Sequence, residues 1–146
     1  MAYLLDTNIL LRESNTADVQ HTVVHRALSK LHLAGETLHI APQILIEFRN
    51  VATRAISLNG LGYLAADAES ESARFQRLFQ LLPETPALFP AWETIVHAHG
   101  VIGKQVHDAR LAAICQLFTV PYVLTFNGGD FKRFGQFLTA VAPASI

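Results

Sequence analysis

The sequence has little cysteine: Cys115 is the one thiol among 146 residues. A single cysteine excludes an intramolecular disulfide and leaves no set of thiolates for a zinc ribbon or zinc finger. The cytoplasm, a reducing compartment, is therefore the expected location. Residues 1–6 carry no basic segment and Asp6 interrupts their apolar run, so we expect no signal peptide. No apolar stretch approaches the roughly 20 residues that a membrane span requires.

Charge is also scarce, since Asp, Glu, Lys and Arg together make up 16% of the residues. The net charge is −1 and the isoelectric point is near 6.6. This balance lacks the overall positive charge that drives binding to nucleic-acid phosphates. Apolar residues make up 51% of the chain and no segment is of low complexity, which favours one globular domain over residues 1–146.

Apolar residues recur at helical spacing in several segments, and short apolar runs lie between them. The pattern predicts helices over residues 19–33, 42–56, 64–82, 90–99 and 107–118. It predicts strands over residues 3–5, 38–40, 87–89, 121–125 and 137–141. This alternation is typical of an α/β fold, with a central, mostly parallel sheet between layers of helices. Such sheets place their sites at the carboxyl ends of the strands, where Asp6 and Thr125 fall.

Asp6 is the first candidate site residue, because it directly follows the apolar run of residues 3–5. Its carboxylate is expected at the end of a buried strand. Asp, Thr and Asn also begin helices by capping free backbone N–H groups. A capping role for Asp6, Thr7 or Asn8 is therefore an open alternative.

Glu47 and Asp108 are carboxylates on the apolar sides of predicted helices. Glu47 projects beside the apolar stripe of residues 42–56, although an ion pair with Arg49 or Arg54 would also explain it. Asp108 lies on the inward face of its helix, in the first turn, where a favourable contact with the helix dipole is the alternative.

Carboxylates that converge on one site repel each other unless a cation is bound between them. Mg²⁺ and Mn²⁺ prefer oxygen ligands, take one or two carboxylates from the protein and keep several waters. A metal-bound water ionises far more readily than bulk water, and the cation stabilises charge that develops on a phosphodiester. The three acids together thus indicate metal-assisted hydrolysis.

Four segments resemble the signature motifs of the PIN-domain family, in the family's order. They are Leu4–Leu10 (LLDTNIL), Ile44–Phe48 (ILIEF), His107–Ala113 (HDARLAA), and Val123–Asn127 (VLTFN) with Asp130–Phe131. Each motif alone is weak, but together they span almost the whole chain. The resemblance implies a three-layer α/β/α PIN-like fold.

The resemblance also implies a ribonuclease in which Asp6, Glu47 and Asp108 hold Mg²⁺ or Mn²⁺ and assist the attack of water on the RNA backbone. The length is similar to that of VapC-type toxins, which a co-expressed antitoxin restrains and which are commonly homodimers. An RNA substrate, a cognate antitoxin and a second copy of the chain are therefore the expected partners.

The fourth acid of the family usually lies two residues after the threonine that corresponds to Thr125. In this sequence Asn127 occupies that position. Asn supplies a carbonyl oxygen or a hydrogen bond, but it brings no charge and accepts no proton as a base. Asp130 is a candidate to reach the metal through a water, and its alternative role is that of a turn residue before Phe131.

Two further groups of residues surround the motifs. Supporting residues that would orient the ligands are Thr7, Asn8 and Thr125. Candidate RNA contacts are Arg12, Arg49, Arg110, Lys132 and Arg133. For Arg110 an ion pair with a nearby acid is the alternative.

Two other functions are consistent with part of the sequence. A PIN-like RNA- or protein-binding module, catalytically weak because of Asn127, is the main alternative. A phosphatase on a similar sheet is the other, although the usual Asp-x-Asp is absent, because Asp6 is followed by Thr7 and Asn8. The Gly60–Ala65 segment matches a dinucleotide-binding loop but follows a predicted helix, which removes the strand that this motif requires.

Overall fold

Five short strands form one sheet in the computed structural model, which describes residues 1–146. The strands are β1 (Ala2–Leu5), β2 (Thr37–Ile40), β3 (Gln80–Leu81), β4 (Tyr122–Leu124) and β5 (Thr139–Val141). Their order is β3-β2-β1-β4-β5, and every neighbouring pair is parallel. The predicted α/β fold is confirmed, with a sheet that is parallel throughout.

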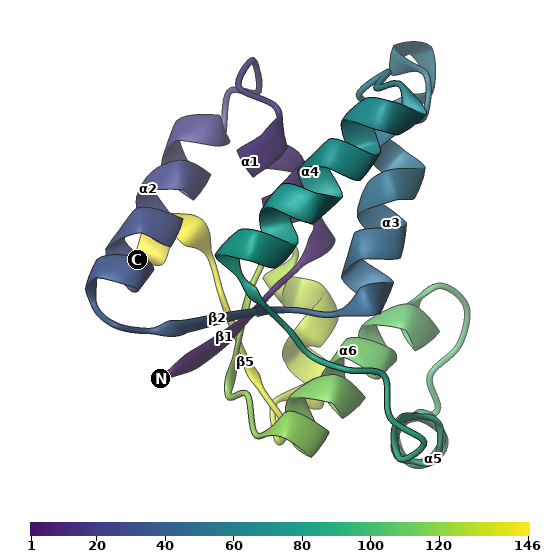
Figure 1. The fold of residues 1–146 in the computed structure, drawn as a ribbon. Coiled ribbons are helices and arrows are strands. Elements are labelled where there is room, and N and C mark those ends of the chain that lie inside the picture. Colours follow the sequence, from purple (N-terminus) through teal and green to yellow (C-terminus); the bar gives the residue numbers. More distant parts are fainter.

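Helices cover both faces of this sheet (Figure 1). They are α1 (Thr7–Ser14), α2 (His21–Leu33), α3 (Pro42–Ala52), α4 (Ala65–Leu78), α5 (Leu88–His99) and α6 (Gln105–Phe118), with the 3₁₀ helices η1 (Ile56–Leu58), η2 (Gly128–Phe134) and η3 (Pro143–Ser145). Crossovers between parallel strands are right-handed. The steps from β1 to β2 to β3 therefore place α1 to α4 on one face. The chain then returns across the sheet to β4, which places α5 and α6 on the other.

This change of direction creates a switch point between β1 and β4. The two strands are adjacent, with Leu5 aligned to Leu124, yet the chain leaves them toward opposite faces. A crevice at the carboxyl ends of such strands is where α/β sheets bind ligands. Asp6 and Thr125, the residues that follow these strands, are thereby brought to one edge of the sheet.

The central strand, β1, lies in the core on both of its faces. Leu4 and Leu5 are fully buried, because helices cover the sheet on both sides, and a parallel strand of this kind is apolar along its whole length. On one face Phe48 of α3 meets Phe75 of α4 edge to face, with 5.2 Å between ring centroids. Leu111, Ala112 and Cys115 of α6 pack within the same core, and burial raises the pKa of the Cys115 thiol to about 12.

Two predictions were wrong, and both concern the segment between the end of α4 and the start of α5. Residues 87–89 do not form a strand, because Leu88 and Phe89 begin α5; Pro90 fits in the first turn, where its missing N–H would have had no helical partner. The helix predicted over 64–82 ends at Leu78, and the chain continues as β3. Pairing of Gln80 and Leu81 with β2 outweighs their helical pattern.

Other boundaries differ by a few residues. Helix α3 ends at Ala52 instead of residue 56, and residue 137 precedes β5 as part of a turn, since its N–H donates to the carbonyl of Phe134. None of the helices combines the length and apolar character that crossing a membrane requires.

Candidate active site

Asp6 lies at the carboxyl end of β1 and is 9% exposed. One carboxylate oxygen, Oδ1, accepts a hydrogen bond from the backbone N–H of Thr7 at 2.7 Å, so Asp6 is the N-cap of α1. The other, Oδ2, accepts from the hydroxyl of Thr125 at 2.6 Å and from the amide of Asn8 at 3.0 Å. The side chain of Asp6 therefore both caps α1 and belongs to the candidate site. Burial raises the pKa of Asp6, and the charge of Glu47 adds to the effect, while these hydrogen bonds oppose it.

Thr125 joins the two halves of the switch point. Its hydroxyl donates to Asp6 and accepts from the Asn8 amide at 3.2 Å and from the backbone N–H of Asn127 at 3.0 Å. Asn8 in turn accepts, through Oδ1, the backbone N–H of Phe126 at 3.2 Å. The loop after β4 is thus fixed to the start of α1, and the supporting residues predicted from sequence do lie against Asp6.

Glu47 of α3 points toward the same edge of the sheet. Its Oε2 accepts a hydrogen bond from the hydroxyl of Thr7 at 2.7 Å, and its Oε1 accepts one from the amide of Gln43 at 3.0 Å. The alternative of an ion pair is wrong, because neither Arg49 nor Arg54 bonds to this carboxylate. Glu47 is held by neutral donors, and no basic side chain forms an ion pair with it.

Asp108 lies in the first turn of α6, where it is half-buried. Its pKa is raised to about 6, first by burial and then by the charges of Asp6, Asp130 and Glu47. No side chain or backbone group donates a hydrogen bond to its carboxylate. Four acids from different parts of the chain therefore act on one another in this region, which is the arrangement that the sequence pattern indicated.

Asn127 and Asp130 lie on the exposed rim of this cluster. Asn127 precedes η2, and its backbone, not its side chain, contacts the site. Asp130 lies in the first turn of η2, where its N–H donates to the carbonyl of Asn127, so it is a turn residue. Its charge also contributes to the raised pKa of Asp108, which places it within electrostatic range of the cluster.

The sequence pattern of the PIN domain matches residues 3–136. The chain belongs to the PIN domain family. A comparison with curated protein sequences found no match.

Several solved structures share this fold. The VapBC2 complex of Rickettsia felis, bound to a DNA fragment from its promoter, is 18% identical with a TM-score of 0.71 over 97% of this chain and 98% of that chain. FitAcB from Neisseria gonorrhoeae is 19% identical with a TM-score of 0.66, covering 99% of both chains. VapC20 from Mycobacterium tuberculosis, a sarcin-ricin loop cleaving toxin, is 18% identical with a TM-score of 0.63, covering 88% and 92%.

The donor set of this PIN domain fits a hard divalent cation. Every candidate ligand offers oxygen, and the repulsion from Asp6, Asp130 and Glu47, which adds to burial in raising the pKa of Asp108, is what a bound cation would relieve. As the side chains stand, no three acidic, histidine or cysteine groups converge within ligating range of one point. Mg²⁺ typically takes one or two carboxylates directly and reaches others through its waters, which suits such a spacing.

The five basic residues predicted as RNA contacts differ from one another in their contacts and exposure. Arg12 stacks over the ring of Phe126 at 4.4 Å and donates to Gln20 and to the carbonyl of Asn8, so it lies beside the acids. Arg110 is bound to Glu84 at 2.7 Å, as its alternative interpretation stated.

The remaining three lie at the surface. Arg133 donates to Gln105 and to the carbonyl of His99, while Arg49 and Lys132 are exposed. Their role as RNA contacts stays a prediction.

Gln43 is the site residue that the sequence reasoning missed. It is 9% exposed, one of four buried polar side chains in the chain, and it contacts both Glu47 and α6. The available signal was its position, because a residue four before Glu47 lies on the same side of a helix.

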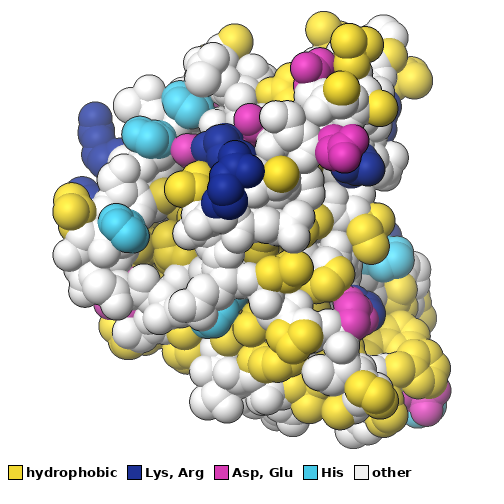
Figure 2. Space-filling view, in the orientation of Figure 1, with side chains coloured by type: hydrophobic (Ala, Val, Ile, Leu, Met, Phe, Trp, Pro, Cys, Tyr) yellow, Lys and Arg dark blue, Asp and Glu magenta, His cyan; other side chains and the backbone are white.

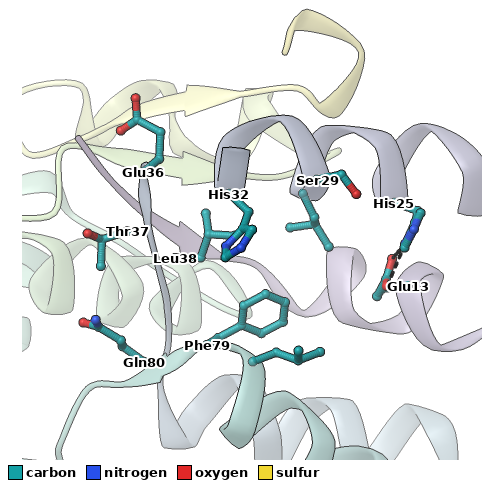
Figure 3. Close-up of a pocket in the computed structure, with 11 residues that line it drawn as sticks. Glu13, His25, Ser29, His32, Glu36, Thr37, Leu38, Phe79 and Gln80 are labelled. Carbon is teal, nitrogen blue, oxygen red and sulfur yellow. Dashed lines mark hydrogen bonds and ion pairs between the residues drawn. The ribbon is translucent and has the colours of Figure 1, made fainter. Parts of the chain in front are cut away.

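A separate hollow of about 420 Å³ lies between α2, β2 and the end of α4, away from the acids (Figure 3). His25 and His32 of α2 line one side, and Phe79 and Leu38 form part of its apolar floor. On this face of the molecule histidines gather over α2, and a cluster of basic side chains lies near the end of α4 (Figure 2). None of the predicted site residues lines the hollow.

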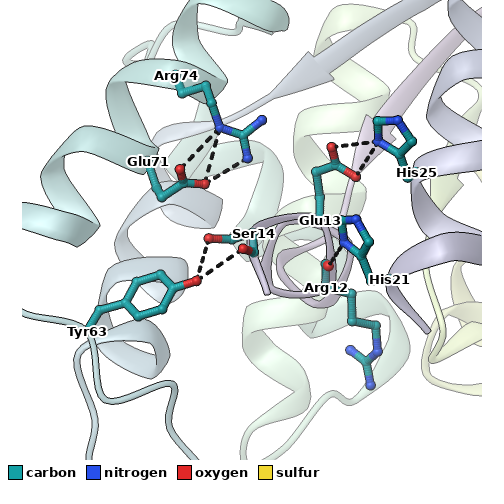
Figure 4. A network of polar contacts seen from close by, with 8 residues as sticks. All are labelled: Arg12, Glu13, Ser14, His21, His25, Tyr63, Glu71 and Arg74. Atoms are coloured by element: carbon teal, nitrogen blue, oxygen red, sulfur yellow. Dashed lines mark hydrogen bonds and ion pairs between the residues drawn. The ribbon is translucent and has the colours of Figure 1, made fainter. Parts of the chain in front are cut away.

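Next to this hollow, polar contacts fix the end of α1 (Figure 4). The hydroxyl of Tyr63 bonds to Ser14 at 2.9 Å, and His25 bonds to Glu13 at 3.1 Å. The first residues of α1 belong to the site, so anchoring its last residues to α2 and to the segment before α4 holds the whole short helix in place.

Proposed function

We propose that this PIN domain is a metal-dependent endoribonuclease and the toxin of a toxin–antitoxin pair. The observation that carries the proposal is that Asp6, Glu47 and Asp130 lie near enough to Asp108 at the switch point for their charges to add to burial in raising its pKa to about 6. Neighbouring carboxylates repel one another, which is unfavourable unless the site binds a cation.

Asp6, Glu47 and Asp108 would hold Mg²⁺ or Mn²⁺, with Asp130 and the neutral Asn127 at the edge of the site. The cation, when bound, supplies an activated water and stabilises charge on the scissile phosphodiester. Thr125 and Thr7 orient Asp6 and Glu47 through hydrogen bonds of 2.6 and 2.7 Å, so the ligands need little reorganisation. Asp108 is free of such bonds and is available to accept a proton from the attacking water.

RNA is the proposed substrate because one relative with this fold is a sarcin-ricin loop cleaving toxin. Arg12, stacked on Phe126 beside the acids, is the basic residue best placed to contact a phosphate or a base. A cognate antitoxin protein is the proposed partner, since the VapBC2 and FitAcB structures are complexes. We also propose a homodimer and a cytoplasmic location.

Cleavage of end-labelled structured RNA tests the proposal. Purified wild type is compared with Asp6→Asn and Asp108→Asn variants in Mg²⁺, Mn²⁺ or EDTA. We expect cutting that requires the metal and disappears in both variants. Equal cutting by all three proteins would assign the activity to a contaminant.

The same assay tests the alternative of a PIN-like binding module. The neutral, exposed Asn127 in place of an acid is the observation that favours it. If the wild type binds RNA without cutting it in any metal, the binding module replaces the nuclease.

A further inference from the structure

Helices α3 and α6 each carry one acid of the proposed site, but they do not pack extensively on each other. Helix α3 packs against α1 and α4, whereas α6 packs against α5 and η2. No backbone hydrogen bond joins α3 to α6. The separation of Glu47 and Asp108 therefore depends on whatever side-chain contacts bridge the two helices.

Gln43 supplies those contacts. Its amide Nε2 donates to Oε1 of Glu47 at 3.0 Å and to the backbone carbonyl of His107 at 3.0 Å. Its carbonyl Oε1 accepts from Nη1 of Arg110 at 3.2 Å. The bonds with the His107 carbonyl and with Arg110 connect α3 to α6, the bond to Glu47 lies within α3, and His107 is the direct neighbour of Asp108. Figure 1 shows the first turn of α3 approaching α6 at this point.

The direction of the Gln43 amide is determined by its partners. Glu47 and the His107 carbonyl accept hydrogen bonds, so both must face the NH₂ group, and Arg110 donates, so it must face the oxygen. Arg110 is itself fixed by Glu84, which lies between β3 and α5, at 2.7 Å. A flipped amide would turn its oxygen toward a carboxylate and a carbonyl. The bridge therefore has one stable orientation.

We infer that Gln43 is a positioning residue, which sets the distance between Glu47 and the first turn of α6, and hence between Glu47 and Asp108. This inference rests on the proposed function. Gln43 makes no contact with substrate in this scheme and acts through the two acids. Side chains that hydrogen-bond to metal ligands change metal affinity or activity by roughly 10–100-fold when they are removed.

A Gln43→Met variant tests the inference, because methionine keeps the length of the side chain but forms neither bridge. Gln116→Met is the matched control: the same substitution on α6, at an exposed position without a hydrogen-bond partner. We expect Gln43→Met to weaken Mn²⁺ binding roughly tenfold by calorimetry and to lower kcat by roughly 10–100-fold. The KM for an oligoribonucleotide should change less than about twofold, since no RNA contact is lost.

Gln43→Glu separates the hydrogen bonds from simple packing. Its shape is nearly unchanged, but it replaces both N–H groups with a carboxylate that faces Glu47 and the His107 carbonyl. We expect a larger loss of kcat than in Gln43→Met. Glu84→Gln, a surface change that spares folding, should weaken Mn²⁺ binding in the same direction by a smaller factor, because it loosens Arg110.

Equal Mn²⁺ affinity in wild type, Gln43→Met and Gln116→Met would overturn the inference. So would a Gln43→Glu protein as active as Gln43→Met. If the wild type binds Mn²⁺ but cuts no RNA, the proposed function fails, while the ratio of Mn²⁺ affinities still decides the role of Gln43.

Discussion

The acids from the N-terminal half of the chain are held differently from those of the C-terminal half. Asp6 and Glu47 accept hydrogen bonds on both carboxylate oxygens, with distances of 2.6–3.0 Å. Asp108 and Asp130 accept none, and Asp108 instead carries a pKa raised to about 6. One half of the site is fixed by its own neighbours before anything binds. The other half depends on a cation or a substrate to compensate its charge.

The largest expected effect is on cleavage, where both halves should be indispensable. Asp6→Asn and Asp108→Asn each remove a charge that would hold the cation, and the loss of several kcal/mol in transition-state stabilisation corresponds to roughly a thousandfold or more in kcat. Single-turnover cleavage of labelled RNA measures it. Loss in only one of the variants would mean that the two halves do not act on the same reaction.

The free energy of unfolding should distinguish the acids of the N-terminal half from those of the C-terminal half. Asp6→Ala removes the cap of α1 and leaves the Thr125 hydroxyl and the Asn8 amide without their acceptor, which should cost about 2–4 kcal/mol. Asp108→Ala breaks no hydrogen bond and should cost much less. Urea unfolding in EDTA compares the two variants, and an equal loss of unfolding free energy would contradict the difference in hydrogen bonding between Asp6 and Asp108.

The free energy of unfolding should depend on pH because the pKa of Asp108 is raised in the folded state. Its folded pKa of about 6 lies above the ordinary value of 3.8, so the folded state favours the protonated form. The resulting stabilisation is complete below about pH 4 and is lost as the pH rises through 6.

Asp108→Asn, which stays neutral, should therefore exceed the wild type in metal-free stability by about 1–2 kcal/mol at pH 8 and match it at pH 4. Urea titrations at the two pH values measure the difference. An equal gain at both would assign it to something other than the charge. Mg²⁺ at pH 8 should stabilise the wild type more than the variant.

The smallest effect is expected at Asn127. Asn127→Asp restores the acid that the family usually has at this position, on the exposed rim of the site. The added charge should raise cleavage by about tenfold or less and tighten Mn²⁺ binding modestly. Parallel cleavage and calorimetry of the two proteins check it. Unchanged values would show that the side chain at this position is too far from the cation to contribute.

The sequence allowed Asp6 and Thr125 to be placed correctly, because each directly follows a short apolar strand and parallel strands end at the same edge. Strand β3 could not be predicted in the same way. Its two residues are exposed and continue a helical pattern, and only their pairing with His39 and Ile40 makes them a strand. Local pattern and tertiary pairing disagree there, and tertiary pairing prevails.

In the candidate site, too, the local features could be predicted from the sequence and the tertiary contacts could not. The acids could be proposed from their position on apolar faces, since an inward-facing charge is unusual wherever it occurs. The bridge formed by Gln43 depends on α3 and α6 meeting at one point, and the ion pair of Arg110 with Glu84 depends on the path of a loop. Neither contact is local in sequence, so neither leaves a periodic signal.

The bond between Thr125 and Asp6 spans 119 positions of the chain. Strand β1 is made first, yet its neighbour β4 is nearly the last strand to be synthesised. On a ribosome, the growing polypeptide therefore cannot assemble its acidic cluster until most of the message has been read. Incomplete translation products that stop before residue 122 lack both β4 and Thr125, and any such fragment would be released without a complete acidic cluster.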